Sequence, residues 1–149
     1  MTDVYDGQMW KDCLDVNGRP FLSQPNNLAL SLNVDWFRPF QHSPYSIGVI
    51  YMAVLNLPRE IRYLPENVII TGIVPGLNEP SKSMMNAVLE PVVGDMQTLF
   101  DGVYMPIPTL MLLITHRALL LCISCDIPAC RKVCGFLGHN AHLACSKCT

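Results

Sequence analysis

Apolar residues alternate with small or polar residues along 28–37, a pattern typical of a β-strand. One face of this segment carries Leu28, Leu30, Leu32 and Val34. The opposite face carries Ala29, Ser31, Asn33 and Asp35. The segment therefore predicts a strand that ends by presenting a carboxylate beside two aromatic residues.

Two further strands are predicted at 45–57 and 67–76, because both segments are rich in β-branched residues. The second of them closes at Pro75-Gly76. Short turns separate all three strands, so antiparallel neighbours are the simplest arrangement. Residues 1–27 carry several glycines and prolines and are predicted to form a loop-rich N-terminal segment.

The hydrophobic period then changes to that of a helix across 85–100. Ser81 or Ser83 is a suitable N-cap, and Gly102 a suitable C-terminal stop. Pro91 is expected to kink or split this helix.

A strand at 118–126 and a short helix at 128–138 complete the pattern, with "MPIP" (105–108) ending the segment before them. The predicted fold class is α/β, with a mixed sheet in the order β-β-β-α-β-α.

Two of the predicted strands end in an aspartate on a face of small residues, namely Asp35 and Asp126. If a helical crossover makes these strands parallel neighbours, both carboxylates lie at the same end of the sheet. Such a pair can hold a divalent cation, as two-metal phosphoryl transfer requires. The alternative is that each aspartate only caps a turn.

Composition places the chain among folded proteins and excludes few functions. It has 149 residues, half of them hydrophobic and 15% charged, which suits one domain with a real core. The mean hydropathy of +0.28 suggests a surface that meets another part of a larger protein. The net charge of −2 gives no electrostatic footprint for nucleic acid. We expect no signal peptide, and His116 and Arg117 interrupt the longest apolar run, which argues against a membrane span.

Five segments together resemble the catalytic core of CACTA-type DNA transposases. They are "DVYDGQMW", "LNVDWFRPF", "YSIGVIYMAVLNLPREIRY", "ENVIITGIVPG" and "CDIPACRKVCGFLGHNAHLACSKC". The resemblance spans roughly residues 3–148. It implies cut-and-paste transposition in the nucleus, an RNase H-like fold and a DDE-type acidic triad that binds Mg²⁺ or Mn²⁺. By this resemblance Asp35 is the first acid and Asp126 the second.

The resemblance also predicts what these 149 residues lack. The third acid of the family lies beyond the cysteine pair, in a second half of the core that we expect to follow Thr149. Residues 28–149 are thus predicted to be a partial RNase H-like core, inactive alone, whose partners are transposon DNA and the missing C-terminal half.

Cys145 and Cys148 form a C-x₂-C pair, which is half of a zinc site. Cys130 and Cys134, four residues apart on a predicted helix, could supply the other half. The resemblance implies a structural role for the C-x₂-C pair. The alternative is that Cys122, Cys125, Cys130 and Cys134 are small buried hydrophobic residues. A zinc-stabilised binding module without catalysis is therefore the second hypothesis, and an interaction remnant with an exposed apolar surface is the third.

Close basic pairs occur at Arg59 and Arg62 and at Arg131 and Lys132. These side chains are candidates for contacts with a DNA phosphate backbone. The alternative is that they are solvated surface cations.

Overall fold

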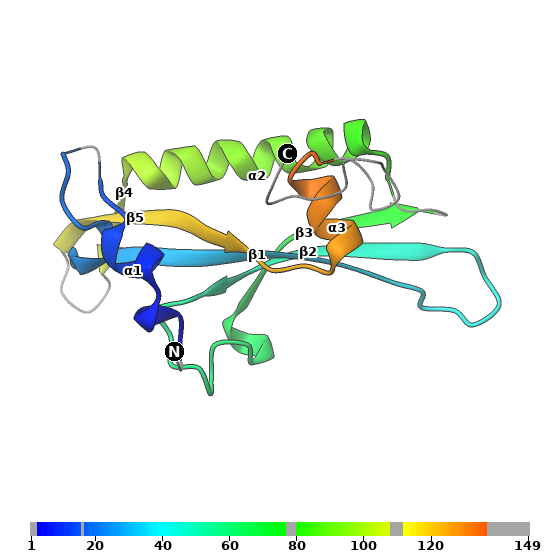
Figure 1. The fold of residues 1–149 in the computed structure, drawn as a ribbon, viewed down its shortest axis with the longest axis horizontal. Coiled ribbons are helices and arrows are strands. Elements are labelled where there is room, and N and C mark those ends of the chain that lie inside the picture. The colour runs from blue at the N-terminus through cyan, green and yellow to red at the C-terminus, as the bar shows by residue number, and fades with distance from the viewer. Residues whose placement is uncertain (1–2, 16, 77–79, 108–111, 137–149) are drawn as a thin grey trace. The chain divides into compact units, whose positions relative to one another are not determined.

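The protein is represented by a computed structural model, which describes residues 3–15, 17–76, 80–107 and 112–136. The elements in chain order are η1 (Val4–Asp6), α1 (Gln8–Asp12), η2 (Phe21–Ser23), β1 (Asn27–Phe37), β2 (Ser46–Val54), η3 (Pro65–Asn67), β3 (Val68–Gly76), α2 (Lys82–Asp101), β4 (Val103–Ile107), β5 (Leu112–Ile123) and α3 (Ile127–Val133) (Figure 1). The fold is therefore mixed α/β. Within the described ranges, no helix has the length and apolarity that a bilayer-spanning segment requires.

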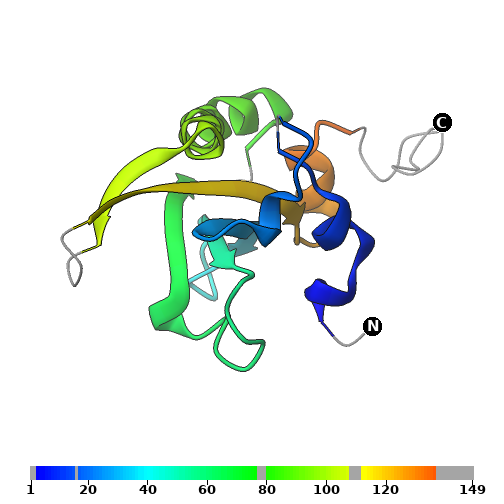
Figure 2. The same cartoon turned by 90° about the vertical axis from the view of Figure 1, so that its left-hand side faces the viewer.

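The strands form a five-stranded sheet in the order β3-β2-β1-β5-β4. The pairing of β1 with β5 is parallel. The Arg117 backbone N–H donates to the Asn26 carbonyl and, farther along both strands, the Ser124 backbone N–H donates to the Leu32 carbonyl. This parallel pairing is the condition on which the metal-binding interpretation of Asp35 and Asp126 depended. In contrast, β4 pairs with β5 in antiparallel register, as Figure 2 shows.

The predicted element order is wrong in one respect, since it omits β4. The observed order of the main elements is β-β-β-α-β-β-α. Pro106 was taken as a break, yet it lies inside β4, which is the last strand in the sheet order. An edge strand tolerates proline because one of its sides needs no ladder hydrogen bond. The next strand also begins earlier than predicted, at Leu112.

Pro91 does not split α2, which is a single helix of 20 residues. Proline removes the hydrogen bond to the carbonyl of Ala87, but both residues are exposed, so water can bond to that carbonyl. The predicted ends of the helix are confirmed. Ser81 Oγ accepts a hydrogen bond from the Met84 backbone N–H at 3.3 Å, and Gly102, with φ of 113°, follows the last residue.

The chain divides into two compact units, which we describe separately. The first comprises residues 1–31, 53–68 and 94–122, and the second comprises residues 32–52, 69–93 and 123–149. In the first unit, Phe21 is fully buried and stacks on Phe100 with ring centroids 5.5 Å apart. Arg62 is also buried there, where its guanidinium donates to the Leu57 carbonyl and pairs with Asp3 at 3.0 Å.

The second unit has a core built from β1, β2 and α2. Ile50 and Met85 are fully buried, and Leu89 lies one helical turn after Met85 on the same face. The Trp36 ring lies so close to Gly48 that a Cβ atom at position 48 would be 2.3 Å from ring carbons. Glycine is therefore required at this position for the tryptophan to pack across β2.

Candidate functional site

The ends of β1 and β5 are linked by two hydrogen bonds within the second unit. The Ser124 backbone N–H donates to the Leu32 carbonyl at 2.8 Å, which continues the parallel ladder. One step farther, the Val34 backbone N–H donates to Cys125 Sγ at 3.1 Å. The thiol thus takes the place of a strand carbonyl at the point where the chain leaves β5 for α3.

Asp35 comes directly after this linked pair on β1. Every residue from Ala29 to Val34 is at most 5% exposed, and burial ends at Asp35, whose side chain is exposed. Its carboxylate makes no hydrogen bond or ion pair with the residues that the structure describes.

Asp126 comes directly after Cys125 and is the N-cap of α3. Its Oδ1 accepts a hydrogen bond from the Ala129 backbone N–H at 2.7 Å. The capping role that the sequence left open is thus what this oxygen performs. The second oxygen, Oδ2, makes no further hydrogen bond with the described residues, so a capping role leaves half of the carboxylate free.

The arrangement brings two carboxylates to the same end of two neighbouring parallel strands. Each aspartate lies one Cα–Cα step of about 3.8 Å beyond one partner of the Val34–Cys125 bond. Carboxylate oxygens are the ligands that Mg²⁺ and Mn²⁺ favour. No group of three or more His, Cys, Asp or Glu side chains in a position to hold a metal occurs within the described ranges. The two aspartates are therefore a candidate for part of a coordination shell.

Three thiols gather around α3 on the same unit. Cys130 Sγ and Cys134 Sγ are 3.9 Å apart. Burial raises the pKa of the Cys134 thiol, and its hydrogen bond with Cys130 raises it further. Burial also raises the pKa of Cys125, and the neighbouring Cys130 and Cys134 add to this effect.

The alternative of buried hydrophobic cysteines does not describe this region. Cys122 and Cys134 are exposed, and Cys125 and Cys130 are half-buried. Cys125 was also overlooked as a linking residue, since the sequence offers no signal that a thiol would replace a carbonyl in the ladder. Cys145 and Cys148, the predicted zinc half-site, lie outside the described residues.

A comparison with protein-family models identifies the family. The model described as "Transposase family tnp2" matches residues 1–149. The chain belongs to this transposase family. A search of curated proteins found no match. The family supports a role related to transposition, with DNA as the partner.

For a member of a transposase family, the basic residues are the natural candidates for phosphate contacts. The structure places Arg59 at the surface and Lys132 in a half-buried position. Arg62 and Arg131 are only 4% and 8% exposed. Arg62 is held by Leu57 and Asp3 and lies 5.6 Å from the Tyr5 ring centroid, so its contacts are internal.

Proposed function

We propose that the chain is part of the catalytic core of a CACTA-type, cut-and-paste DNA transposase that acts in the nucleus. The proposed core is RNase H-like, with Asp35 and Asp126 as the first two acids of a DDE-type site. The family match supports this proposal. The observation that supports it best is the parallel pairing of β1 with β5, closed by the Val34–Cys125 hydrogen bond, because Asp35 and Asp126 follow the two partners of that bond in the chain.

Asp35 and Asp126 fit the role of metal ligands in two respects. Asp35 is exposed and unpaired among the described residues, and Asp126 keeps one oxygen free while the other caps α3. We assign Mg²⁺ or Mn²⁺ to this pair. A metal ion bound there would activate water or a 3′-hydroxyl for attack on a DNA phosphate and stabilise the charge on the leaving oxygen.

The proposal assigns metal binding, and not turnover, to residues 1–149. Two-metal phosphoryl transfer needs more ligands than two carboxylates, and the described residues bring no third ligand to this group. We therefore expect the chain alone to bind Mn²⁺ weakly and to leave supercoiled plasmid DNA uncut.

Trp36 makes the proposal testable, because it follows Asp35 directly in β1. In a Trp10→Phe background, Trp36 is the remaining tryptophan, and bound Mn²⁺ should quench its fluorescence. We expect Asp35→Asn and Asp126→Asn each to weaken Mn²⁺ binding about tenfold, since each removes a charged ligand. Glu90→Gln is the matched control, because Glu90 is an exposed acid elsewhere in the second unit. Equal Mn²⁺ affinity in all variants would exclude the two aspartates as the metal site.

One observation favours the second candidate function, a zinc-stabilised module that binds without catalysis. Two thiolates on one tetrahedral zinc ion, with bonds of about 2.3 Å, are about 3.8 Å apart. The separation of Cys130 Sγ and Cys134 Sγ, 3.9 Å, agrees with this value. Cys145 and Cys148 remain the proposed second half of the site.

Zinc content and Co²⁺ absorption test this candidate. We expect the Cys130→Ser/Cys134→Ser variant to lose the thiolate-to-cobalt band, whereas Cys13→Ser should keep it. The second double variant is Cys145→Ser/Cys148→Ser. If neither double variant changes the cobalt spectrum, the zinc-module hypothesis is excluded. The two hypotheses are separable because Mn²⁺ binding at the aspartates does not use the thiols.

A further inference from the structure

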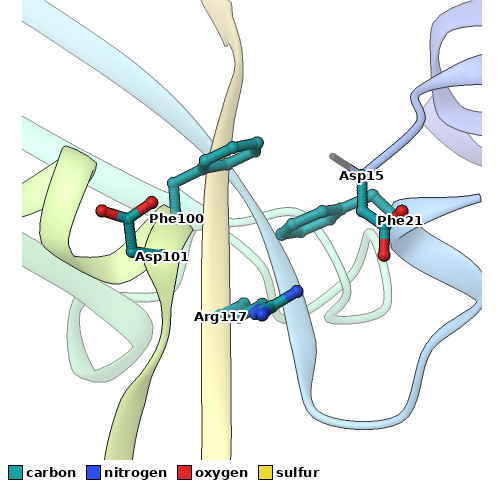
Figure 3. A pocket seen from close by; sticks show the side chains of 5 residues that line it. All are labelled: Asp15, Phe21, Phe100, Asp101 and Arg117. Atoms are coloured by element: carbon teal, nitrogen blue, oxygen red, sulfur yellow. The ribbon is translucent and has the colours of Figure 1, made fainter. Parts of the chain in front are cut away.

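A cavity of about 150 Å³ lies entirely within the first unit. Five side chains line it, from the N-terminal loop, the end of α2 and β5: Asp15, Phe21, Phe100, Asp101 and Arg117 (Figure 3). Two of them are stacked aromatic rings and three are charged. This combination of a flat apolar wall with a few polar groups is typical of a small-molecule subsite.

The inner part of the cavity is fixed by the N-terminal loop. Asp15 is 7% exposed, and its two oxygens accept hydrogen bonds from Asn17 and Arg19. Its charge is therefore satisfied within the loop. The fully buried Phe21 ring is also held in place, since its backbone N–H donates to the Cys13 carbonyl and its own carbonyl accepts from Asn27 Nδ2. Neither residue must move to admit a ligand.

The outer part of the cavity carries two charges that have no partner among the described residues. Asp101 is the last residue of α2, where the helix dipole disfavours a negative charge, and the last turn contains no basic residue. The Arg117 guanidinium makes no hydrogen bond or ion pair with the residues that the structure describes, although the Arg117 side chain lies against Gly102. Among the described residues, a carboxylate acceptor and a guanidinium donor thus remain without a partner beside the part-exposed Phe100 ring.

We propose that this cavity, formed by Phe100, Asp101 and Arg117 over Phe21, binds one unstacked pyrimidine base of single-stranded DNA, with cytosine favoured. The proposal rests on the proposed action on DNA, but it does not use Asp35 or Asp126. The Phe100 face would stack on the base, as aromatic side chains do in single-strand binding. Asp101 would accept from the exocyclic amine of cytosine, and Arg117 would donate to its ring acceptors.

Size and chemistry decide between possible occupants. The cavity volume of about 150 Å³ is half of the roughly 300 Å³ of the smallest drug-sized ligand pockets. This size excludes a whole nucleotide and favours a single ring over a purine. A phosphate is disfavoured by the two carboxylates on the wall. Thymine lacks the exocyclic amine that a carboxylate accepts from, so cytosine is the better partner for Asp101.

The test uses the 149-residue chain and a short single-stranded oligonucleotide that carries one cytosine and a fluorescein label at its 5′ end, in a buffer with EDTA. We expect the fluorescence anisotropy of the label to rise on binding, and about tenfold weaker binding for Phe100→Leu, since stacking of one base is worth about 1–3 kcal/mol. Arg117→Gln should weaken binding to a similar extent. Asp95→Asn, an exposed acid on the same helix, is the matched control for Asp101.

Asp101→Asn gives the sharpest result, because an amide can donate to thymine whereas a carboxylate cannot. We expect this variant to lose the preference for cytosine over thymine in unlabelled competitor oligonucleotides, with no fall in its melting temperature. Equal binding of oligonucleotides with cytosine and with an abasic site at the same position would overturn the proposal. So would an unaltered cytosine preference in a folded Asp101→Asn variant. Because EDTA removes divalent metals, failure of the aspartate site leaves this result unaffected.

Discussion

The backbone N–H of Val34 donates a hydrogen bond to the Sγ atom of Cys125, at a distance of 3.1 Å. This single contact joins the end of a buried strand to the turn that leads into α3. Val34 and Cys125 directly precede Asp35 and Asp126, so the contact also fixes the backbone next to each aspartate. The candidate metal site therefore depends on a residue that carries no charge and would bind no ion itself.

The first prediction concerns this bond. Cys125→Ala leaves the buried Val34 N–H without a partner, which we expect to lower the free energy of unfolding by about 1–3 kcal/mol. Cys125→Ser keeps an acceptor and should cost less. Urea denaturation, with Cys122→Ala as an exposed cysteine control, measures both values. Equal stability of Cys125→Ala and Cys122→Ala would show that the bond contributes nothing.

A second prediction concerns the close contact of Gly48 with Trp36. Gly48→Ala places a methyl group against the ring and should destabilise the fold by about 1–3 kcal/mol. A Trp36→Leu change in the same chain should recover part of that loss, since it removes the obstructing ring. Gly94→Ala is the control, because nothing lies within 4 Å of a Cβ there and the site is helical. That control should gain about 0.5–1 kcal/mol. No coupling between positions 36 and 48 in the double-mutant cycle would contradict the packing.

Much of this architecture was accessible from the sequence, because burial imposes a period on the chain. Strand β1 was predicted almost to the residue, and the capping serine and the terminal glycine of α2 were both confirmed. What failed involved proline. Pro91 and Pro106 are breakers by local rules, yet one lies on an exposed helix face and the other on an edge strand. Such tolerance depends on tertiary position, which local patterns do not contain.

The candidate site was only partly predictable for a similar reason. Asp35 and Asp126 were selected because both follow small-residue faces, and the parallel pairing agrees with that choice. By contrast, the burial of Arg62 depends on Asp3, which is 59 residues away in the chain. The cavity beside Arg117 likewise requires segments that meet only after folding. Contacts between distant segments leave no period in the sequence.

A third prediction concerns Arg62. Arg62→Met removes the ion pair with Asp3 and the donors to the Leu57 carbonyl, so we expect a loss of about 1–3 kcal/mol. Arg38→Met should change stability by less than about 0.5 kcal/mol, as is usual for exposed positions. Chemical denaturation distinguishes the two. If Arg62→Met is as stable as Arg38→Met, the buried arginine has no structural role.

A fourth prediction concerns how the stability of the fold changes at acid pH. The pKa of Asp15 is lowered from its ordinary 3.8, chiefly by the hydrogen bond from the Arg19 backbone, although burial opposes this effect. A lowered pKa in the folded state means that stabilisation is present above pH 3.8 and is lost as the pH falls through the folded-state value. We therefore expect Asp15→Asn to melt at a lower temperature than the wild type at pH 6. The difference should shrink below about pH 4. A constant difference from pH 6 to pH 2 would contradict this assignment.

The central claim is that Asp35 and Asp126 bind the same ion. Electron paramagnetic resonance of free Mn²⁺ measures the affinity and stoichiometry for the wild type, for Asp35→Asn, for Asp126→Asn and for the double variant. A shared ion predicts that the wild type binds one Mn²⁺ at this site, and that the double variant is hardly weaker than either single variant, because coupled ligands are not additive. Losses that sum across the two positions, or single variants that bind Mn²⁺ as the wild type does, would show that the two carboxylates do not meet at one metal.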